Sequence, residues 1–153
     1  MFYMGEGFKE LMRITKTLTF DEYSRLMDKW LDVIRSAHND EAKERLEERR
    51  NDFQLKWMEG WLEDYKKQIT TEAQEEIYEL LDYAVHNSTS GSAVTSVPTK
   101  KLADEIDEIM WGEIGHFMLD APEIYEDEDG DWVIDCMFGG CYIPGWDGWE
   151  EYY

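Results

Sequence analysis

A glutamate and a histidine one helical turn apart are the first residues in this 153-residue chain whose spacing could support chemistry. Glu113 and His116 have the Glu-x-x-His spacing that places two metal ligands on one face of a helix in carboxylate-bridged di-metal bundles. Such a centre needs a second copy of the motif and two further inward glutamates, and the sequence has no second copy. We therefore expect His116 to be a packed or surface histidine, and we expect no metal site.

An acidic stretch near the C-terminus resembles a calcium-binding loop in the spacing of its side chains. Asp127, Asp129 and Gly130 stand at positions that such loops use. The first position would be Tyr125 and the last Cys136, where the ion needs a carboxylate and a bidentate glutamate. The pattern fails at both ends, so we expect no specific calcium site.

Motifs of the common reaction classes are absent from the sequence. It contains no P-loop, no GxGxxG after a strand, no GxSxG nucleophile elbow and no HExxH zinc helix. Paired carboxylates could serve a glycosidase, but that chemistry needs a cleft and two distinct environments, which a sequence does not reveal. We therefore expect a protein that is not an enzyme and that binds no cofactor.

The charge of the chain is both large and unevenly distributed. The sequence holds 36 acids and 15 bases, a formal net charge of −21. Binding phosphates requires a lysine and arginine surface, so this composition argues against direct binding of nucleic acid or of an anionic membrane. Residues 1–67 carry a net −2, whereas residues 68–153 carry −19, with only Lys100 and Lys101 against 21 acids. This polarity favours steering toward a basic partner, although a merely solvated acidic surface would have the same composition.

The sequence offers nothing that resembles a targeting or membrane segment. The N-terminus has no basic stretch before an apolar run, and no stretch reaches the roughly 18 to 20 continuous apolar residues of a membrane span. We therefore expect a cytoplasmic protein. Its two cysteines, Cys136 and Cys141, are expected to be reduced, because two cysteines do not make a disulfide framework.

Apolar residues recur at a spacing of three or four through most of the chain, which predicts helices. Capping-box patterns mark two of the helix starts, Thr19 with Glu22 and Thr71 with Gln74. The expected helices cover about 6–17, 20–37, 40–67, 72–85 and 100–119. We expect these segments to form a single domain, residues 1–153, as a bundle of four or five helices.

The connecting and C-terminal segments do not have the helical period. Residues 87–98 are small and polar and are expected to form a flexible loop, and residues 120–131 are expected to form an acidic loop. A β-hairpin is expected around 132–143, with two adjacent glycines as its turn. An aromatic and acidic tail, 145–153, follows. The expected fold class is therefore mainly α (α+β), a helical bundle with a C-terminal β-hairpin.

Six of the seven tryptophans fall into two groups. Four of them lie on or beside apolar helical stripes and are expected in the core: Trp30, Trp57, Trp61 and Trp111. Trp146 and Trp149 lie in the acidic tail, where no period indicates burial. The tail could fold over the bundle, or its tryptophans could anchor a partner, as such residues do at interfaces.

We expect an acidic inhibitor that binds the basic surface of a larger protein, most concretely a nucleic-acid-binding enzyme. Carboxylates can replace phosphates in a nucleic-acid channel, and aromatic rings can occupy the places of bases. In net charge and size the chain resembles the DNA-mimic inhibitors of phages and mobile elements, including some anti-CRISPR and anti-restriction proteins. The residues expected to contact the partner are Asp104, Glu105, Asp107, Glu108, Glu123, Glu126, Asp127, Glu128, Asp129, Asp131, Trp146, Asp147, Trp149, Glu150 and Glu151.

Two other hypotheses fit the same composition. The chain could be an immunity protein or antitoxin that neutralises one basic toxin, which the same charge pattern permits. It could also be a structural or assembly protein that uses the aromatic tail for contacts between subunits.

Overall fold

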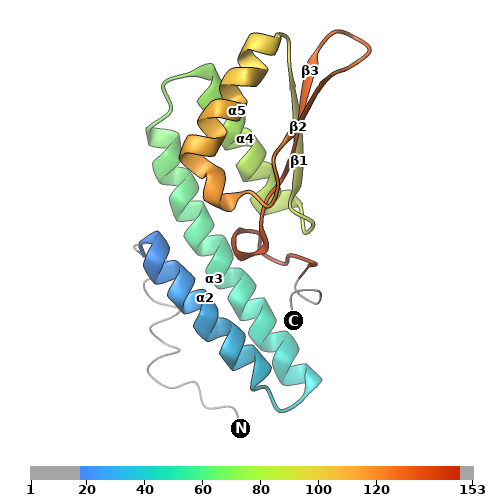
Figure 1. The fold of residues 1–153 in the computed structure, drawn as a ribbon. Helices are drawn as coiled ribbons and strands as arrows, with labels where there is room; N and C mark the ends of the chain where they lie inside the picture. The colour runs from blue at the N-terminus through green and yellow to red at the C-terminus, as the bar shows by residue number, and fades with distance from the viewer. Residues whose placement is uncertain (1–17, 149–153) are drawn as a thin grey trace. The chain divides into compact units, whose positions relative to one another are not determined.

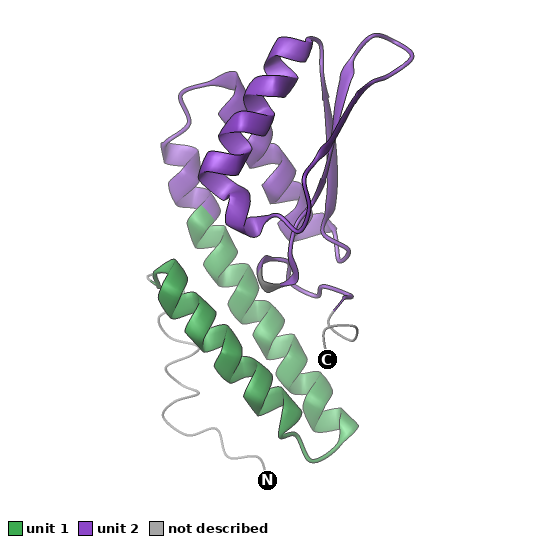
Figure 2. Cartoon of the chain, viewed as in Figure 1, with its two compact units in different colours: residues 1–61 green, residues 62–153 purple. Residues whose placement is uncertain are grey.

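The computed structural model describes residues 18–148, which form four α-helices and a three-stranded sheet (Figure 1). The fold class is mainly α with a small β component near the C-terminus, as the sequence predicts. The chain divides into two compact units after Trp61, inside helix α3 (Asp40–Lys67) (Figure 2). The helix expected over 6–17 and the last residues of the tail, 149–153, lie outside the described residues.

Helix α2 (Phe20–Arg35) in the first unit begins at the predicted capping box. The Thr19 hydroxyl accepts a hydrogen bond from the Glu22 backbone N–H at 3.2 Å, and the Glu22 carboxylate accepts one from the Thr19 N–H at 3.3 Å. Two N–H groups that a helix start leaves unpaired are thereby satisfied. The helix ends two residues before the predicted limit of residue 37.

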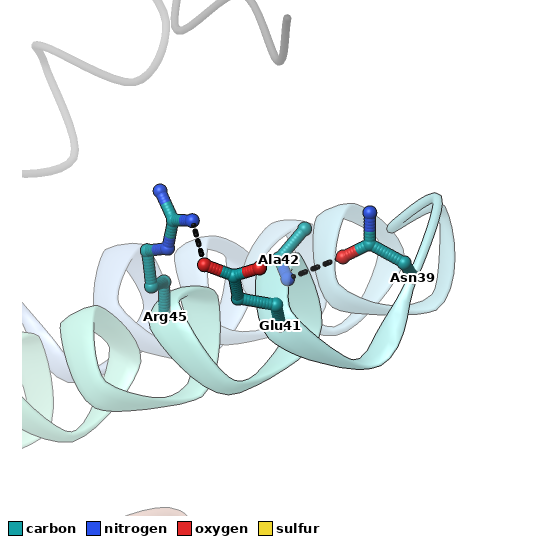
Figure 3. Close-up of polar contacts among 4 residues, drawn as sticks. All are labelled: Asn39, Glu41, Ala42 and Arg45. Atoms are coloured by element: carbon teal, nitrogen blue, oxygen red, sulfur yellow. Dashed lines mark hydrogen bonds and ion pairs between the residues drawn. The ribbon is translucent and has the colours of Figure 1, made fainter.

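Helix α3 begins after a short break, where Asn39 acts as the cap. The Asn39 side chain accepts a hydrogen bond from the Ala42 N–H at 2.8 Å, as Figure 3 shows. In the same turn the Glu41 carboxylate lies 2.7 Å from the Arg45 guanidinium, in an exposed ion pair four residues apart. The predicted helix over 40–67 is confirmed.

Stacked aromatic rings form the core of the first unit. The Tyr23 ring is stacked with two rings of α3, with centroids 4.0 Å from Trp57 and 5.6 Å from Phe53. The Trp57 indole N–H donates a hydrogen bond to the Leu18 carbonyl at 3.0 Å. Trp30 and Trp57 are buried, as their positions on apolar stripes predict.

Two helices of the second unit begin at the residues that the sequence predicts. Helix α4 (Glu72–Asn87) begins at the capping box of Thr71 and Gln74, and helix α5 (Lys100–Ile114) begins where the Thr99 hydroxyl accepts from the Leu102 N–H at 3.2 Å.

Helix α5 ends at Ile114, so the prediction that it continues to residue 119 is wrong. A short 3-10 helix, η2 (Gly115–Phe117), follows it directly. After η2 the Leu119 N–H donates to the Met137 carbonyl at 2.8 Å, a bond to the end of a strand. A long-range backbone contact therefore holds the chain that follows the helix in a non-helical path.

Three antiparallel strands form the sheet in the order β1-β3-β2. Strand β1 (Ser92–Val97) lies inside 87–98, and strand β2 (Glu123–Glu126) lies inside 120–131. The prediction that these two segments are loops is therefore wrong over those residues. Both strands pair with β3 (Trp132–Met137). Because their strand structure depends on pairing with β3, the small or acidic residues of β1 and β2 do not by themselves indicate strands.

The C-terminal hairpin is present, but its second strand is not the predicted one. Strand β3 lies where the hairpin was expected to begin, whereas Gly140–Tyr142 form a 3-10 helix, η3, in place of a returning strand. The hairpin consists of β2 and β3. The chain is held in another path after β3, because the Gly139 N–H donates to the Phe117 carbonyl at 2.7 Å and a Cβ at Gly140 would overlap the Trp146 ring.

Asp127 organises the turn between β2 and β3. One oxygen of its carboxylate accepts hydrogen bonds from the N–H groups of Asp129 at 2.9 Å and Asp131 at 3.0 Å. Gly130 has φ of +84°, a conformation that favours glycine. The acidic spacing that resembles a calcium loop thus builds a tight turn whose backbone uses the Asp127 oxygen.

Helices α4 and α5 cover one face of the sheet (Figure 1). The Thr95 hydroxyl of β1 donates to the Glu76 carboxylate of α4 at 2.9 Å, and the Cys136 sulfur of β3 lies 3.8 Å from the Met110 sulfur of α5. The core of the second unit therefore lies between one helical layer and one sheet face. The other face of the sheet carries Val94, whose side chain is exposed.

Candidate partner-binding surface

The division of the chain into two units coincides closely with the division of its charge. Residues 1–61 contain 13 acids and 11 bases, a net of −2, whereas residues 62–153 contain 23 acids and 4 bases, a net of −19. The sequence placed this boundary after Lys67, and the structure places the unit boundary six residues earlier. The acidic part of the chain is therefore a compact unit with its own core.

Helix α5 presents part of the predicted set to solvent. Asp104, Glu105 and Glu108 are exposed and Asp107 is half-buried. The reason is the apolar stripe on the other side of the helix, which is buried at Ala103, Ile106, Met110 and Ile114. Because that stripe packs toward the sheet, the exposed acids of α5 point away from the sheet.

Trp111 is exposed, so the prediction that it belongs to the core is wrong. About half of its surface, 48%, is accessible to solvent, on the side of α5 that carries Glu108 one turn earlier. A Cβ at Gly115 would lie 3.3 Å from the Trp111 ring, so the ring rests against that glycine. The exposure of Trp111 could have been inferred from the sequence, because it lies one residue after Met110 and therefore outside the apolar stripe of α5.

Strands β2 and β3 place acids on the sheet face that the helices leave open. Glu123 lies directly opposite Asp135 in the register of these strands. Asp135 alternates with the buried residues Ile134 and Cys136, whose side chains face the helices, so Asp135 and its partner Glu123 belong to the open face. Asp135 is not among the residues predicted to contact the partner, although the strand alternation around it was a usable indication.

The hairpin turn holds a third group of predicted acids. Glu126, Glu128 and Asp129 are exposed, whereas Asp127 and Asp131 are half-buried. Because the Asp127 carboxylate accepts two backbone N–H groups, this residue has a structural task that its neighbours do not share.

Trp146 is half-buried against the backbone of η3. The adjacent Asp147 is exposed, and its N–H donates to the Thr89 carbonyl at 2.9 Å, which ties this part of the tail to the segment before β1. At these positions the tail is folded onto the second unit, which agrees with the hypothesis that the tail folds over the rest of the protein. Trp149, Glu150 and Glu151 lie outside the described residues.

The predicted partner-binding residues do not form one surface. The acids of α5 point away from the sheet, and Glu123 lies on the face of the sheet that is turned away from α5. These two groups therefore face opposite sides of a two-layer unit, with the turn acids at one end of the β2–β3 hairpin.

Glu113 has partners that explain its position. Its carboxylate accepts hydrogen bonds from the Tyr65 hydroxyl and from the Gln74 amide, both at 3.0 Å. His116, the other half of the Glu-x-x-His pair, is exposed beside Phe117, and partial burial lowers its pKa below 6.5. Within residues 18–148, no group of three or more His, Cys, Asp or Glu side chains is placed to hold a metal ion.

Cys136 is a free thiol in the core of the second unit, which confirms the prediction for this cysteine. Burial is the main cause that raises its pKa to about 12, and the charges of Asp135 and Asp107 act in the same direction. The thiol is therefore protonated at neutral pH and contributes packing rather than nucleophilic chemistry.

No protein-family model, no curated protein and no solved structure matches this chain. Among the residues described, no helix combines the length and the apolar character that crossing a membrane requires.

The chemistry available on the second unit is therefore recognition of cations. Carboxylates lie on α5, on the open sheet face and at the hairpin turn, and exposed large apolar side chains lie on α5 and on the sheet, among them Val94, Trp111 and Tyr125. Exposed aromatic residues surrounded by charge are typical of protein interfaces.

Proposed function

We propose that this protein is an acidic inhibitor that binds the basic surface of a larger protein through its second unit, residues 62–153. The target is a nucleic-acid-binding enzyme, and the inhibitor blocks its nucleic-acid channel as a mimic of DNA or RNA. This is the mode of action of the DNA-mimic inhibitors of phages and mobile elements, some anti-CRISPR and anti-restriction proteins among them, that the chain resembles in charge and size.

The observation that carries the proposal is the concentration of charge in one folded unit. A net charge of −19 on residues 62–153, against −2 on residues 1–61, creates a one-sided field. Such a field attracts a basic surface and accelerates association with it, and it repels nucleic acid.

The inhibition is competitive and needs no catalysis by this chain. Carboxylates of the second unit occupy the positions of phosphates along the basic channel, and exposed aromatic rings contact surfaces that otherwise receive bases. The inhibitor acts in the cytoplasm, where its target meets nucleic acid, and it requires no cofactor.

Capture of the target followed by a competition assay tests the proposal. The full chain is immobilised, nuclease-treated lysate is passed over it, and bound proteins are eluted across a series from about 50 to about 500 mM salt. Each captured protein is then assayed for binding its own DNA or RNA with and without added inhibitor. We expect loss of nucleic-acid binding as inhibitor is added, with affinity falling steeply as salt increases.

Two variants that remove the same charge from the two units provide the matched control. In the second unit the substitutions are Glu123→Gln, Glu126→Gln, Glu128→Gln and Asp129→Asn. In the first unit they are Asp28→Asn, Asp32→Asn, Glu44→Gln and Glu48→Gln; all eight residues are exposed. Only the variant with substitutions in the second unit should weaken inhibition. A captured protein that still binds its nucleic acid normally in the presence of the inhibitor would rule out mimicry.

A further inference from the structure

The open face of the sheet combines exposed apolar side chains with two carboxylates. Val94 of β1 is 58% exposed and Tyr125 of β2 is 49% exposed. Between them, on the central strand, lie Val133, which is directly opposite Tyr125, and Asp135, which is directly opposite both Val94 and Glu123. These five side chains share one face, because directly paired residues of antiparallel strands point to the same side.

The pair Glu123 and Asp135 is unfavourable in the protein by itself. Directly opposite side chains on antiparallel strands have Cβ atoms about 5 Å apart, and like charges at such positions destabilise the sheet. Within residues 18–148 neither carboxylate forms an ion pair with a base. The four bases of the second unit lie on α3 and α5, and no base lies on a strand.

A cation from another molecule would relieve this repulsion. A second copy of the chain would bring the same carboxylates and a second net charge of −19 to the face, so self-association there is disfavoured. Among cationic side chains, arginine fits best. Its planar guanidinium can donate to two carboxylates together, and it stacks on aromatic faces such as that of Tyr125.

We propose that the open sheet face is the docking site for an arginine-bearing segment of the basic partner. The guanidinium binds between Glu123 and Asp135, and the apolar part of the segment covers Val94 and Tyr125. This inference rests on the proposed function in assuming a basic partner, and it names the surface and the side chain that the partner supplies. The acids of α5, on the opposite side of the unit, then contribute only to long-range attraction.

The test uses octa-arginine as the probe and the full chain, labelled with ¹⁵N. Changes in amide chemical shift on titration locate the probe without any substitution. We expect the largest changes in β1, β2 and β3, at Val94, Tyr125 and Asp135. Changes concentrated on α5 around Trp111 would overturn the assignment.

Two double variants measure the contribution of each face. Glu123→Gln with Asp135→Asn removes the sheet pair, and Asp104→Asn with Glu108→Gln removes a like-charge pair four residues apart on α5. Both variants remove two negative charges from the second unit. The sheet variant should bind octa-arginine about tenfold more weakly, and the helix variant no more than about threefold more weakly. Equal losses would show that only the overall field matters and would overturn the proposal.

Thermal unfolding provides a readout that a merely structural role would not produce. Neutralising the sheet pair should raise the unfolding midpoint while it weakens binding, because the repulsion is removed together with the guanidinium site. If this variant does not fold, Tyr125→Ala replaces it, with Tyr83→Ala on α4 as its exposed control.

Octa-lysine distinguishes arginine recognition from general attraction, and equal affinity for the two peptides would overturn the arginine assignment. Absence of binding at the sheet face would overturn this inference but leave the inhibitor proposal, which the competition assay decides. Binding of octa-arginine here without displacement of nucleic acid from any captured protein would instead remove the inhibitor proposal alone.

Discussion

The Tyr65 hydroxyl donates a hydrogen bond to the Glu113 carboxylate at 3.0 Å and so connects the end of α3 to α5. The same carboxylate accepts from Gln74, whose own carbonyl oxygen accepts from the N–H groups of Thr70 and Thr71 at the start of α4. The Glu113 carboxylate therefore binds both the buried Tyr65 and the capping residue Gln74. Three helices of the second unit are joined by polar contacts that their apolar stripes do not indicate.

Removing the Tyr65 hydroxyl should destabilise the second unit. Tyr65→Phe keeps the ring and deletes a hydrogen bond to a carboxylate, so we expect a loss of about 1 to 2 kcal/mol in the free energy of unfolding, measured in urea. Tyr83→Phe is the control, because the Tyr83 side chain is exposed, and its stability should remain within about 0.5 kcal/mol of the parent. Equal stability of the two variants would contradict a structural role for the Tyr65–Glu113 bond.

Alkaline pH should weaken the fold partly through the same tyrosine. Burial, the hydrogen bond to Glu113 and the charge of that carboxylate together raise the pKa of Tyr65 well above 10. An unfolded tyrosine loses its proton near pH 10, whereas the folded one keeps it, so unfolding releases a proton and stability falls as pH rises above about 10. Tyr65→Phe should show a shallower decline between about pH 10 and pH 11 than Tyr83→Phe. Parallel curves would argue against this contribution.

The Cys136 thiol should resist modification in the folded protein. In a Cys141→Ser variant Cys136 is the single cysteine, and its burial and its pKa of about 12 keep the thiolate fraction very small at pH 8. Reaction with a disulfide reagent should therefore be slow in buffer and rapid in denaturing urea. Fast reaction in buffer would mean that the strand opens readily, which the contact with Met110 does not predict.

The sequence predicted the elements whose causes are local. Helices α2 and α4 have capping boxes and apolar stripes within one segment, and their starts are where the sequence placed them. Strand β1 has no such indication, because its burial depends on β3 about forty residues later in the chain. The returning strand expected after β3 fails for the same reason, since the Trp146 ring against Gly140 is a tertiary contact.

The candidate site was predictable in composition but not in arrangement. The sequence located the acidic half of the chain, and the unit boundary agrees with it. It did not show that Glu123 and Asp135 face each other, because that depends on strand register. The sequence also assigned Trp111 to the core, because tryptophan is a residue type common in cores. Trp111 is exposed because it lies beside the apolar stripe of α5, on a part of the helix that does not face the core.

The two glycines Gly140 and Gly112 should respond in opposite ways to alanine. A Cβ at Gly140 would overlap the Trp146 ring, so Gly140→Ala should cost about 1 to 3 kcal/mol or displace the ring from η3. Gly112 is exposed on α5 with no neighbouring atom within 4 Å of a Cβ, so Gly112→Ala should add up to about 1 kcal/mol of stability. Urea unfolding with tryptophan fluorescence measures both. Similar effects at the two positions would contradict the packing of Trp146.

Asp127 and Asp129 carry the same charge in the same turn, but they should differ in their effect on the fold. Asp127→Ala removes the oxygen that accepts from the N–H groups of Asp129 and Asp131, and we expect a loss of about 1 kcal/mol or more. Asp129→Ala removes an exposed carboxylate and should change stability by less than about 0.5 kcal/mol. Amide hydrogen exchange in β2 and β3, together with urea unfolding, measures the difference. If the two variants lose stability equally, charge rather than hydrogen bonding governs the turn, and Asp127 belongs with its neighbours among the partner-binding acids.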